Sequence, residues 1–562
     1  MNEPRSRRAW GGALALIVGA SLAGAAEPPA DLVVVGAQVW SGRSDAVDAT
    51  ALAVRGERLV AVGGDTEVRA LVGPATRVVD AGGRLVVPGF IDDHTHFVDG
   101  GFELLGADLR DAATPEEFTR RFAEFAAGVP AGRWITAVTW DHERWPGAPL
   151  PRREWIDDAA GDRPVFVSRL DGHMALANSR ALQLAGVTRE TPDPPGGSIV
   201  RDAVTGEPTG VLKDAAMARV WAVVPPASEA ELADALRTAS AHAARLGVTT
   251  VHDITLWEHW PVLRKLRQSG ELQTRVYART PLAAWERQRD LVAREGAGDA
   301  WLRLGGFKAF VDGSLGSSTA LFYEPYADAP ETAGIFVDDW YPEGILERRA
   351  LAADAAGFQL SIHAIGERAN AELLDVYARV AAANGPRDRR FRVEHAQHLR
   401  PAEVKRFAAD GVFASMQPFH AADDGRWADK RLGARARNSY VFRSLLDAGA
   451  RVGFGSDWPV ATLDPLAGIA AAVTRRTLDG AHPEGWYPEE RVSLVAALRA
   501  YTAANAWAEF AEADKGTLEP GKLADFVVLS ENLFQLPPER LEGARVDLTV
   551  VGGRVVFERT ER

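Results

Sequence analysis

The chain has 562 residues, and on a soft prior of about 150 residues per domain it is long enough for three or four domains or for one large barrel with additions. Hydrophobic residues make up 46% and charged residues 25%, which is typical of a globular protein, and a net charge of −13 excludes nucleic acid as an expected partner. Cysteine is absent, so any metal must be held by histidine and carboxylate groups.

The N-terminus has the three regions of an export signal. Three arginines within the first eight residues precede an apolar run over 13–25 that ends in Ala23-Gly24-Ala25. The run is too short for a membrane span of about 20 residues. We therefore expect residues 1–25 to be a signal peptide and the mature protein to be periplasmic or secreted, without a membrane span. Arg7-Arg8 resembles a twin-arginine signal, and the general secretory route is the alternative.

Short runs of β-forming residues lie near both ends of the mature chain. They occur at 31–35, 51–54, 58–62 and 77–80, and again at 524–529 and 549–556. Two β-rich termini around a long α/β middle predict one composite β-sandwich domain, formed by residues 26–84 and 515–562.

The middle of the chain alternates β-branched runs with segments of helical period, which predicts βα units around a parallel sheet. Eight strands are expected, at 86–93, 248–253, 274–279, 303–311, 358–363, 390–395, 411–417 and 451–456. Eight units favour an α/β fold of the (β/α)8 TIM barrel type over residues 85–514, with the active site at the carboxyl ends of the strands. The gap after the first strand is too long for one βα connection. It predicts an insertion domain over about residues 100–240 that lies across the mouth of the barrel.

Metal-type ligands follow several of these strands. His94-Thr95-His96 ends the first, and alternate residues of a strand point to the same side. Two such imidazoles can chelate a metal, although an isolated pair is weak evidence and more often has a solvated or structural role. His363, His395 and Asp457 end three further strands.

Lys308 lies within an otherwise apolar strand, where a charge is costly unless it is neutralised, paired or modified. A deprotonated lysine can add carbon dioxide and become a carbamate, whose oxygens can bridge two cations. A salt bridge inside the barrel is the alternative.

The segment 88–96, Pro-Gly-Phe-Ile-Asp-Asp-His-Thr-His, resembles the signature of the amidohydrolase superfamily. The order His-x-His, Lys, His, His, Asp is similar to its binuclear type. Finer motifs at 171–173, 312–317 and 455–459 resemble amidohydrolase family 3, the YtcJ-like branch that contains N-substituted formamide deformylase. The likeness extends from about residue 31 to the C-terminus.

The resemblance implies a site with two divalent metal ions. His94 and His96 would bind the first together with Asp457, and His363 and His395 would bind the second. Lys308, N6-carboxylated, would bridge them. Zinc fits these ligands, with manganese, iron or nickel as alternatives.

The resemblance also implies the reaction: a metal-dependent amidohydrolase that cleaves an amide, formamide or cyclic amide by attack of metal-bound hydroxide. Asp457 would orient the water and pass its proton to the leaving amine, or else serve only as a ligand. Two other readings stay open. The same site could act as an esterase, lactonase or deaminase, or the chain could be a binding protein without catalysis, which metal chelation would leave functional.

Four residues are candidates for contact with a small-molecule substrate. His173 of the insertion could reach a substrate carbonyl, Trp140 and Trp458 could form apolar walls, and Asp312 begins a glycine-rich loop that could shape the pocket. His252 is expected behind the ligands. We expect His142, His398 and His420 to lie at the surface or behind the site. A homodimer is left open.

Overall fold

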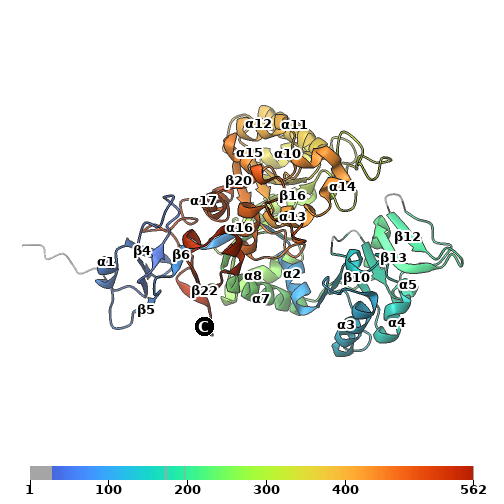
Figure 1. The fold of residues 1–562 in the computed structure, drawn as a ribbon, viewed down its shortest axis with the longest axis horizontal. Coiled ribbons are helices and arrows are strands. Elements are labelled where there is room, and N and C mark those ends of the chain that lie inside the picture. Colours follow the sequence, from blue (N-terminus) through green and yellow to red (C-terminus); the bar gives the residue numbers. More distant parts are fainter. Residues whose placement is uncertain (1–27, 171, 173, 195–196, 561–562) are drawn as a thin grey trace, which may run out of the picture.

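The computed structural model describes residues 28–170, 172, 174–194 and 197–560. The expected signal peptide, residues 1–25, and His173 lie outside the described residues, so export and the role of His173 stay predictions. Figure 1 shows three parts in a row: a β-sandwich, a central barrel and an insertion domain at the opposite end.

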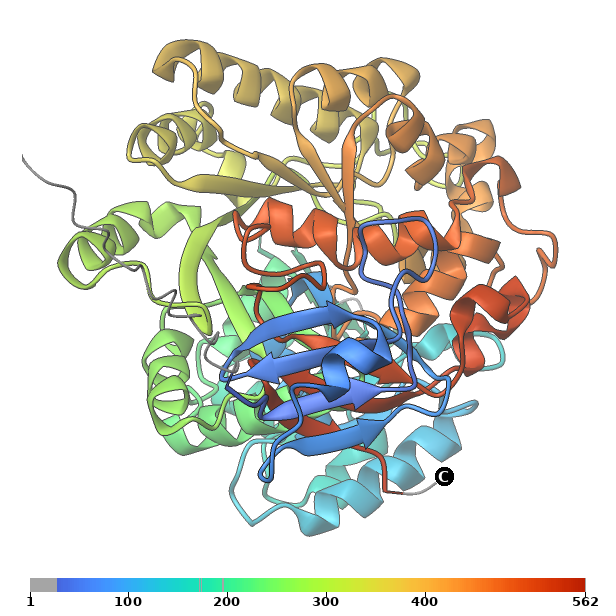
Figure 2. The same cartoon turned by 90° about the vertical axis from the view of Figure 1, so that its left-hand side faces the viewer.

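The β-sandwich is built from both ends of the chain, and it faces the viewer in Figure 2. One sheet has the order β4 (Arg58–Gly63), β3 (Ala51–Arg55), β1 (Leu32–Val35) and β5 (Arg77–Asp80). The other has the order β2 (Gln38–Val39), β6 (Leu85–Pro88), β21 (Phe526–Leu529), β22 (Val546–Val551) and β23 (Arg554–Glu558). Val34 and Leu52 of the first sheet share one buried cluster with Val86, Phe526 and Val550 of the second. Burial of these side chains therefore joins the two ends of the chain.

The strand expected at 86–93 is split in the structure. Leu85–Pro88 pairs within the sandwich, and Phe90–Thr95 (β7) pairs with a barrel strand. Gly89 lies between them, where a Cβ atom would come within 2.3 Å of the Thr249 hydroxyl. The sandwich thus includes four residues beyond the boundary expected at residue 84, because the absence of a side chain lets the chain cross from one part to the other.

The barrel is a nearly closed sheet of eight parallel strands, which confirms the expected fold class. Its order is β7 (Phe90–Thr95), β14 (Val248–Ile254), β15 (Arg275–Pro281), β16 (Leu302–Phe310), β17 (Gln359–Ala364), β18 (Arg392–His395), β19 (Phe413–Met416) and β20 (Arg451–Phe454). Each strand overlaps one expected from the sequence.

Closure of the barrel between β20 and β7 uses side-chain and loop contacts. The Asn505 amide donates to the carbonyls of Ile91, at 2.6 Å, and Phe454, at 2.8 Å. Beyond β20, the Asp457 N–H donates to the His94 carbonyl at 2.8 Å. Two of the expected ligands are therefore joined through their backbones where the barrel closes.

Helices surround the sheet and bury its outer face. They are α8 (His259–Ser269), α9 (Trp285–Glu295), α10 (Ile345–Ala355), α11 (Glu367–Asn384), α12 (Pro401–Ala409), α13 (Pro418–Asp424), α14 (Ala428–Leu432), α15 (Phe442–Asp447), α16 (Pro465–Thr474), α17 (Leu494–Ala500) and α18 (Ala503–Ala508). A small helix, α1 (Asp65–Arg69), belongs to the sandwich. Among the described helices, none is long and apolar enough to cross a membrane.

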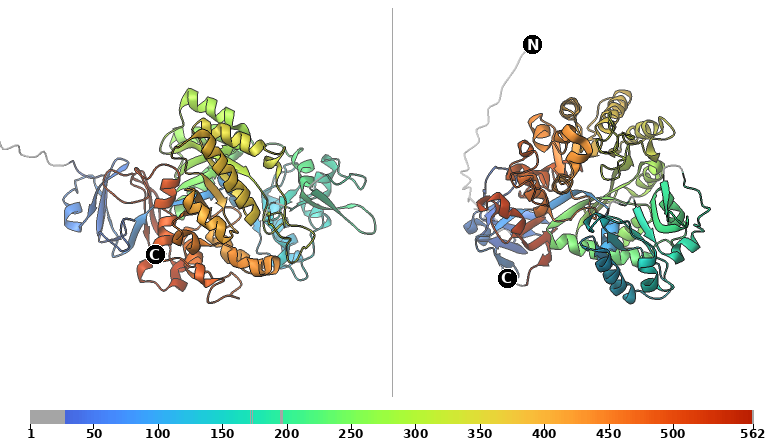
Figure 3. Two further views of the ribbon diagram at one scale, coloured as in Figure 1. Left: turned by 90° about the horizontal axis from the view of Figure 1, so that it is seen from above. Right: turned by 45° about the vertical axis from the view of Figure 1, so that its right-hand side comes forward.

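The insertion follows β7 and is attached through two helices, α2 (Phe97–Leu105) and α7 (Glu229–Arg245). These pack so closely that a Cβ on Gly101 would come within 2.1 Å of the Ala235 carbonyl. Beyond them lie β8 (Ala107–Leu109) and β9 (Val138–Trp140), a sheet of β10 (Phe166–Ser168), β11 (Met174–Ala177), β13 (Pro208–Asp214) and β12 (Gly197–Arg201), and helices α3 (Pro115–Gly128), α4 (Glu154–Ala160), α5 (Ser179–Leu184) and α6 (Ala218–Trp221). Both views in Figure 3 place this part on the side of the barrel away from the sandwich.

Candidate active site

The six expected ligand residues converge at the carboxyl ends of the barrel strands. They are His94 in β7, His96 directly after it, Lys308 in β16, His363 in β17, His395 at the end of β18 and Asp457 after β20. Five of the six line a cleft between the barrel and the insertion, and His94 is fully buried beneath it. Chain topology therefore brings together residues that are up to 363 positions apart in the sequence.

One group of three donors has the spacing of a metal site. The Nε2 atoms of His94 and His96 each lie 3.4 Å from the Asp457 carboxylate. Zinc–ligand bonds of about 2.1 Å at tetrahedral angles separate donor atoms by about 3.4 Å. The donor atoms of all three side chains lie within 4.8 Å of one another, so they can hold one cation.

Lys308 points at the same place. Its Nζ lies 3.2 Å from His94 Nε2, and the residue is only 3% exposed. Burial lowers the pKa of Lys308 to about 7, so much of the amine is neutral at neutral pH. Among the described carboxylates, none forms an ion pair with Lys308, which goes against the alternative of a simple salt bridge. A neutral amine directed at imidazole and carboxylate groups is the state from which a carbamate forms.

His363 and His395 lie side by side, with ring centres 4.5 Å apart. The Nδ1 of His395 contacts the Gln417 side-chain oxygen at 2.8 Å, which leaves Nε2 for another partner. The Nε2 of His363 contacts the Gly313 carbonyl at 3.1 Å. The His395 ring therefore has one nitrogen fixed by the protein, in the way that a metal ligand requires.

The backbone at two of these positions is strained. His395 has φ of +74° and Asp457 has φ of +61°, values that residues other than glycine rarely adopt. Such strain concentrates where a side chain must be aimed at a particular point. In β18 and after β20, it directs the two side chains toward the centre of the site.

A buried ionic network fixes His94 from behind. The Glu394 carboxylate contacts His94 Nδ1 and forms ion pairs with Arg279 at 2.8 Å and Arg392 at 2.9 Å. Burial alone would raise the pKa of Glu394, but the two guanidinium groups outweigh it and hold this pKa well below its usual range. A carboxylate on Nδ1 sets the ring orientation and leaves Nε2 facing the site.

Glu394 and Gln417 were not among the residues expected from the sequence. Glu394 directly precedes His395, and Gln417 follows β19 near its end, so both carry the same signal as the ligands: a polar residue in or after an apolar strand. Behind them, Arg392 contacts His252 at 2.7 Å, and His252 faces Glu509 at 3.5 Å. This places His252 behind the ligands.

Asp457 stays ionised in this setting. Burial acts to raise its pKa, but the adjacent His94 and His96 outweigh burial and hold the pKa of Asp457 well below its usual range. The residue is nonetheless in contact with the cleft. It can therefore accept a proton from a group in the cleft.

Three residues expected to contact substrate lie elsewhere. The Asp312 carboxylate accepts backbone N–H groups of Leu321, Ile365 and Gly366 at 2.8 to 3.0 Å, so it fixes loops near the site and does not line the cleft. Trp140 is fully buried in the core of the insertion, where its Nε1 donates to the Val167 carbonyl at 2.9 Å. Both corrections have one reason: internal partners satisfy the polar groups of these side chains.

Trp458 is the third residue that was expected to contact substrate and does not line the cleft. Its ring packs between Phe97 and His242, with centre distances of 5.9 and 5.5 Å, and contributes to the core under α2 and α7. A Cβ on Gly100 would come within 2.4 Å of this ring. Trp458 thus positions the residue before it, Asp457, and is no wall of the cleft.

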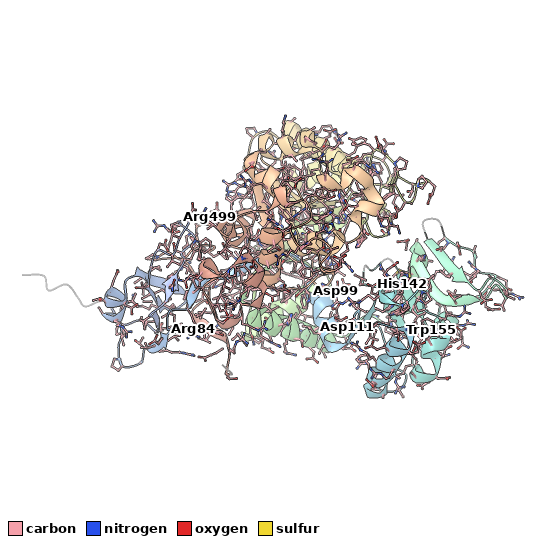
Figure 4. The ribbon with its side chains drawn as sticks, viewed as in Figure 1. Arg84, Asp99, Asp111, His142, Trp155 and Arg499 are labelled. Carbon is pink, nitrogen blue, oxygen red and sulfur yellow. The ribbon has the colours of Figure 1, made fainter. Side chains whose placement is uncertain are left out.

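The cleft itself has a volume of about 2390 Å³. Sites for small molecules usually measure about 300–1,000 Å³. The cleft is lined by residues of the barrel and of the insertion. Figure 4 labels two of the lining residues, Asp99 of α2 and His142 of the insertion. The cleft has room for a substrate that extends well beyond the reacting group.

Comparison with known proteins agrees with this geometry. Residues 77–557 match the model of the amidohydrolase family. The protein LONG AFTER FAR-RED 3 of Arabidopsis thaliana is 41% identical over 542 residues, which cover 94% of this chain and 92% of that protein. N-substituted formamide deformylase of Arthrobacter pascens is 29% identical and covers 94% of this chain and 99% of its own length. These matches confirm the resemblance inferred from the motifs.

Among solved structures, a metal-dependent hydrolase of Pyrococcus furiosus superposes with a TM-score of 0.73 at 28% identity. The match covers 89% of this chain and 99% of that one. The fold is therefore shared along most of both chains.

Proposed function

The chain belongs to the amidohydrolase family and is a metal-dependent hydrolase, and from this premise we propose that it cleaves the C–N bond of an amide, a formamide or a cyclic amide. The observation that carries the proposal is the group formed by His94, His96 and Asp457, whose 3.4 Å spacings fit a cation. The neutral lysine beside this group supports a second cation.

In this proposal His94, His96 and Asp457 would hold one divalent ion, and His363 and His395 would hold the other. Lys308, as its carbamate, would be a ligand to both, and zinc is the metal that we favour. When bound, the ions would polarise the scissile carbonyl and lower the pKa of a water molecule toward neutrality.

The chain's own residues supply proton transfer and orientation. Asp457 takes the proton from the attacking water, and the same carboxylate returns it to the leaving nitrogen as the C–N bond breaks. One water is consumed, and a carboxylic acid and an amine are released. Glu394 holds His94 and Gln417 holds His395, so the rings do not turn during the reaction.

Two observations favour an N-substituted formamide or a related N-substituted amide. One is the similarity along 94% of the chain to an enzyme named for that substrate class. The other is the size of the cleft, about 2390 Å³, which leaves room for a bulky substituent on the nitrogen.

The test is a hydrolysis panel of N-benzylformamide, N-benzylacetamide, a cyclic amide and benzyl formate. We expect cleavage of at least one C–N substrate that is lost on chelation and restored by zinc with bicarbonate. His96→Asn should lose this activity, while His482→Asn, in a loop outside the cleft, should keep it. Metal-loaded enzyme that cleaves only the ester, or nothing, would reject the proposal.

We also propose that the protein is exported after removal of residues 1–25, on the pattern of the N-terminal sequence. N-terminal sequencing of protein recovered from the producing cells should then begin at residue 26. An intact Met1 on the bulk of the protein would contradict export.

A further inference from the structure

His420 lies beside the site without a role in the ligand set. It belongs to α13, which begins directly after Gln417, and it lines the cleft. Its Nε2 is buried and has no hydrogen-bond partner among the described residues. Its ring is nearly parallel to that of His395, with the centres 6.4 Å apart. A buried nitrogen without a partner is costly, so this position indicates a partner that the substrate supplies.

His420 also lies close to Asp457. A nitrogen of His420 and a carboxylate oxygen of Asp457 lie within 4.8 Å of each other. His94 and His96, in contrast, approach that carboxylate to 3.4 Å. Two hydrogen bonds of about 2.8 Å that meet at one tetrahedral atom separate their outer atoms by about 4.6 Å. The space between His420 and Asp457 thus fits a substrate atom that is hydrogen-bonded to both side chains.

We propose that His420 Nε2 accepts a hydrogen bond from the N–H of the scissile amide, and that this contact makes the enzyme selective for N-monosubstituted amides and formamides. The inference rests on the proposed C–N hydrolysis, in which Asp457 protonates the same nitrogen. A neutral imidazole with its proton on Nδ1 has a lone pair on Nε2, as the contact requires.

The contact has a definite consequence for the reaction. Once water has added to the carbonyl carbon, the nitrogen lone pair is no longer delocalised and must face the protonated Asp457. Holding the N–H at His420 turns the lone pair toward Asp457, which then gives its proton as the C–N bond breaks. A tertiary amide or an ester has no such hydrogen, so its reaction gains nothing from His420.

The experiment compares three substrates that differ only at the leaving atom: N-benzylformamide, N-benzyl-N-methylformamide and benzyl formate. His420→Phe should lower kcat/KM for the first by about tenfold to a hundredfold and leave the other two within about twofold. His420→Gln, which keeps an acceptor, should recover part of the loss. His482→Phe is the matched control, since that histidine lies outside the cleft.

Two measurements are independent of turnover. Metal content per chain should be the same in His420→Phe and the wild type. Calorimetry should show weaker binding of benzylamine to the variant, with binding of benzyltrimethylammonium, which has no N–H, unchanged.

The outcomes distinguish failure of the His420 hydrogen bond from failure of the proposed C–N hydrolysis. Equal losses on all three substrates, or loss of metal from His420→Phe, would overturn the hydrogen bond to N–H, as would an unchanged rate on N-benzylformamide. If metal-loaded wild type cleaves no C–N substrate of this set or of the earlier panel, the proposed function fails and the inference fails with it. Cleavage of a cyclic amide alone would overturn only the inference.

Discussion

Lys308 is the residue on which the arrangement of the centre depends most. It is enclosed in the barrel with Nζ 3.2 Å from His94, and burial holds its pKa near 7. A lysine that stayed fully charged there would repel the cations that the surrounding ligands fit. The account therefore requires its modification.

Lys308→Ala should leave at least one metal position empty, because the bridging oxygens are lost. Elemental analysis should show a reduced metal content, and a short carboxylic acid such as acetate should restore part of the activity by occupying the space. Full metal content together with full activity in this variant would remove Lys308 from the centre.

Asp457→Asn separates ligation from proton transfer. An amide oxygen can still face His94 and His96, but it cannot accept a proton, so kcat should fall by about 10²- to 10⁴-fold while metal content stays nearly normal. Steady-state kinetics on metal-loaded protein provide the measurement. An unimpaired kcat would leave Asp457 as a ligand only.

Among the elements, α13 carries two groups with different roles, His420 near its start and Asp424 at its end. The Asp424 carboxylate accepts from the Tyr440 hydroxyl at 2.5 Å and the Gln397 amide at 2.9 Å. Burial raises the pKa of Asp424 to about 7, so the folded protein favours the protonated form.

This shift predicts how stability depends on pH. The contribution of Asp424 is fully present below its unfolded pKa of 3.8 and is lost as pH rises through about 7. Asp424→Asn keeps an acceptor and cannot ionise, so its Tm should exceed that of the wild type by more at pH 8 than at pH 5. Thermal unfolding at both pH values tests this, and a difference that is constant or shrinks toward pH 8 would contradict it.

The sequence was sufficient to predict the strands and the polar residues that converge at their ends, since apolar runs and the polar residues that end them are local patterns. It could not predict Glu394 against His94, because that contact joins β18 to β7 across 300 positions. Nor could it show that Trp140 and Asp312 have internal partners, since burial depends on the folded neighbours. His420 lacks a strand-end position, and only its place beside Asp457 makes it a candidate.

In the whole molecule, the barrel is joined to the sandwich by a buried ion pair. Arg275 of β15 contacts Asp525 through two hydrogen bonds of 2.8 and 2.9 Å, and both side chains are almost fully enclosed. Asp525 also accepts the Gly552 N–H at 2.7 Å. This ion pair thus fixes the sandwich to the barrel, on the side of the barrel away from the insertion.

Asp525→Asn should destabilise the protein strongly, because removal of one partner leaves Arg275 buried and unpaired at a cost of about 3–5 kcal/mol. Thermal unfolding should show a clear fall in Tm, while metal content at low temperature stays normal since the site is at the other end of the barrel. A Tm within about a degree of the wild type would show that the pair does not hold the two parts together.

The presence of a two-metal centre is decided by the metal content per chain, determined by elemental analysis of purified protein after incubation with zinc and bicarbonate. We expect about two transition-metal ions per chain, with the first lost in a His94→Ala, His96→Ala double variant. Protein that is folded and yet holds no metal under these conditions would contradict the account at its base.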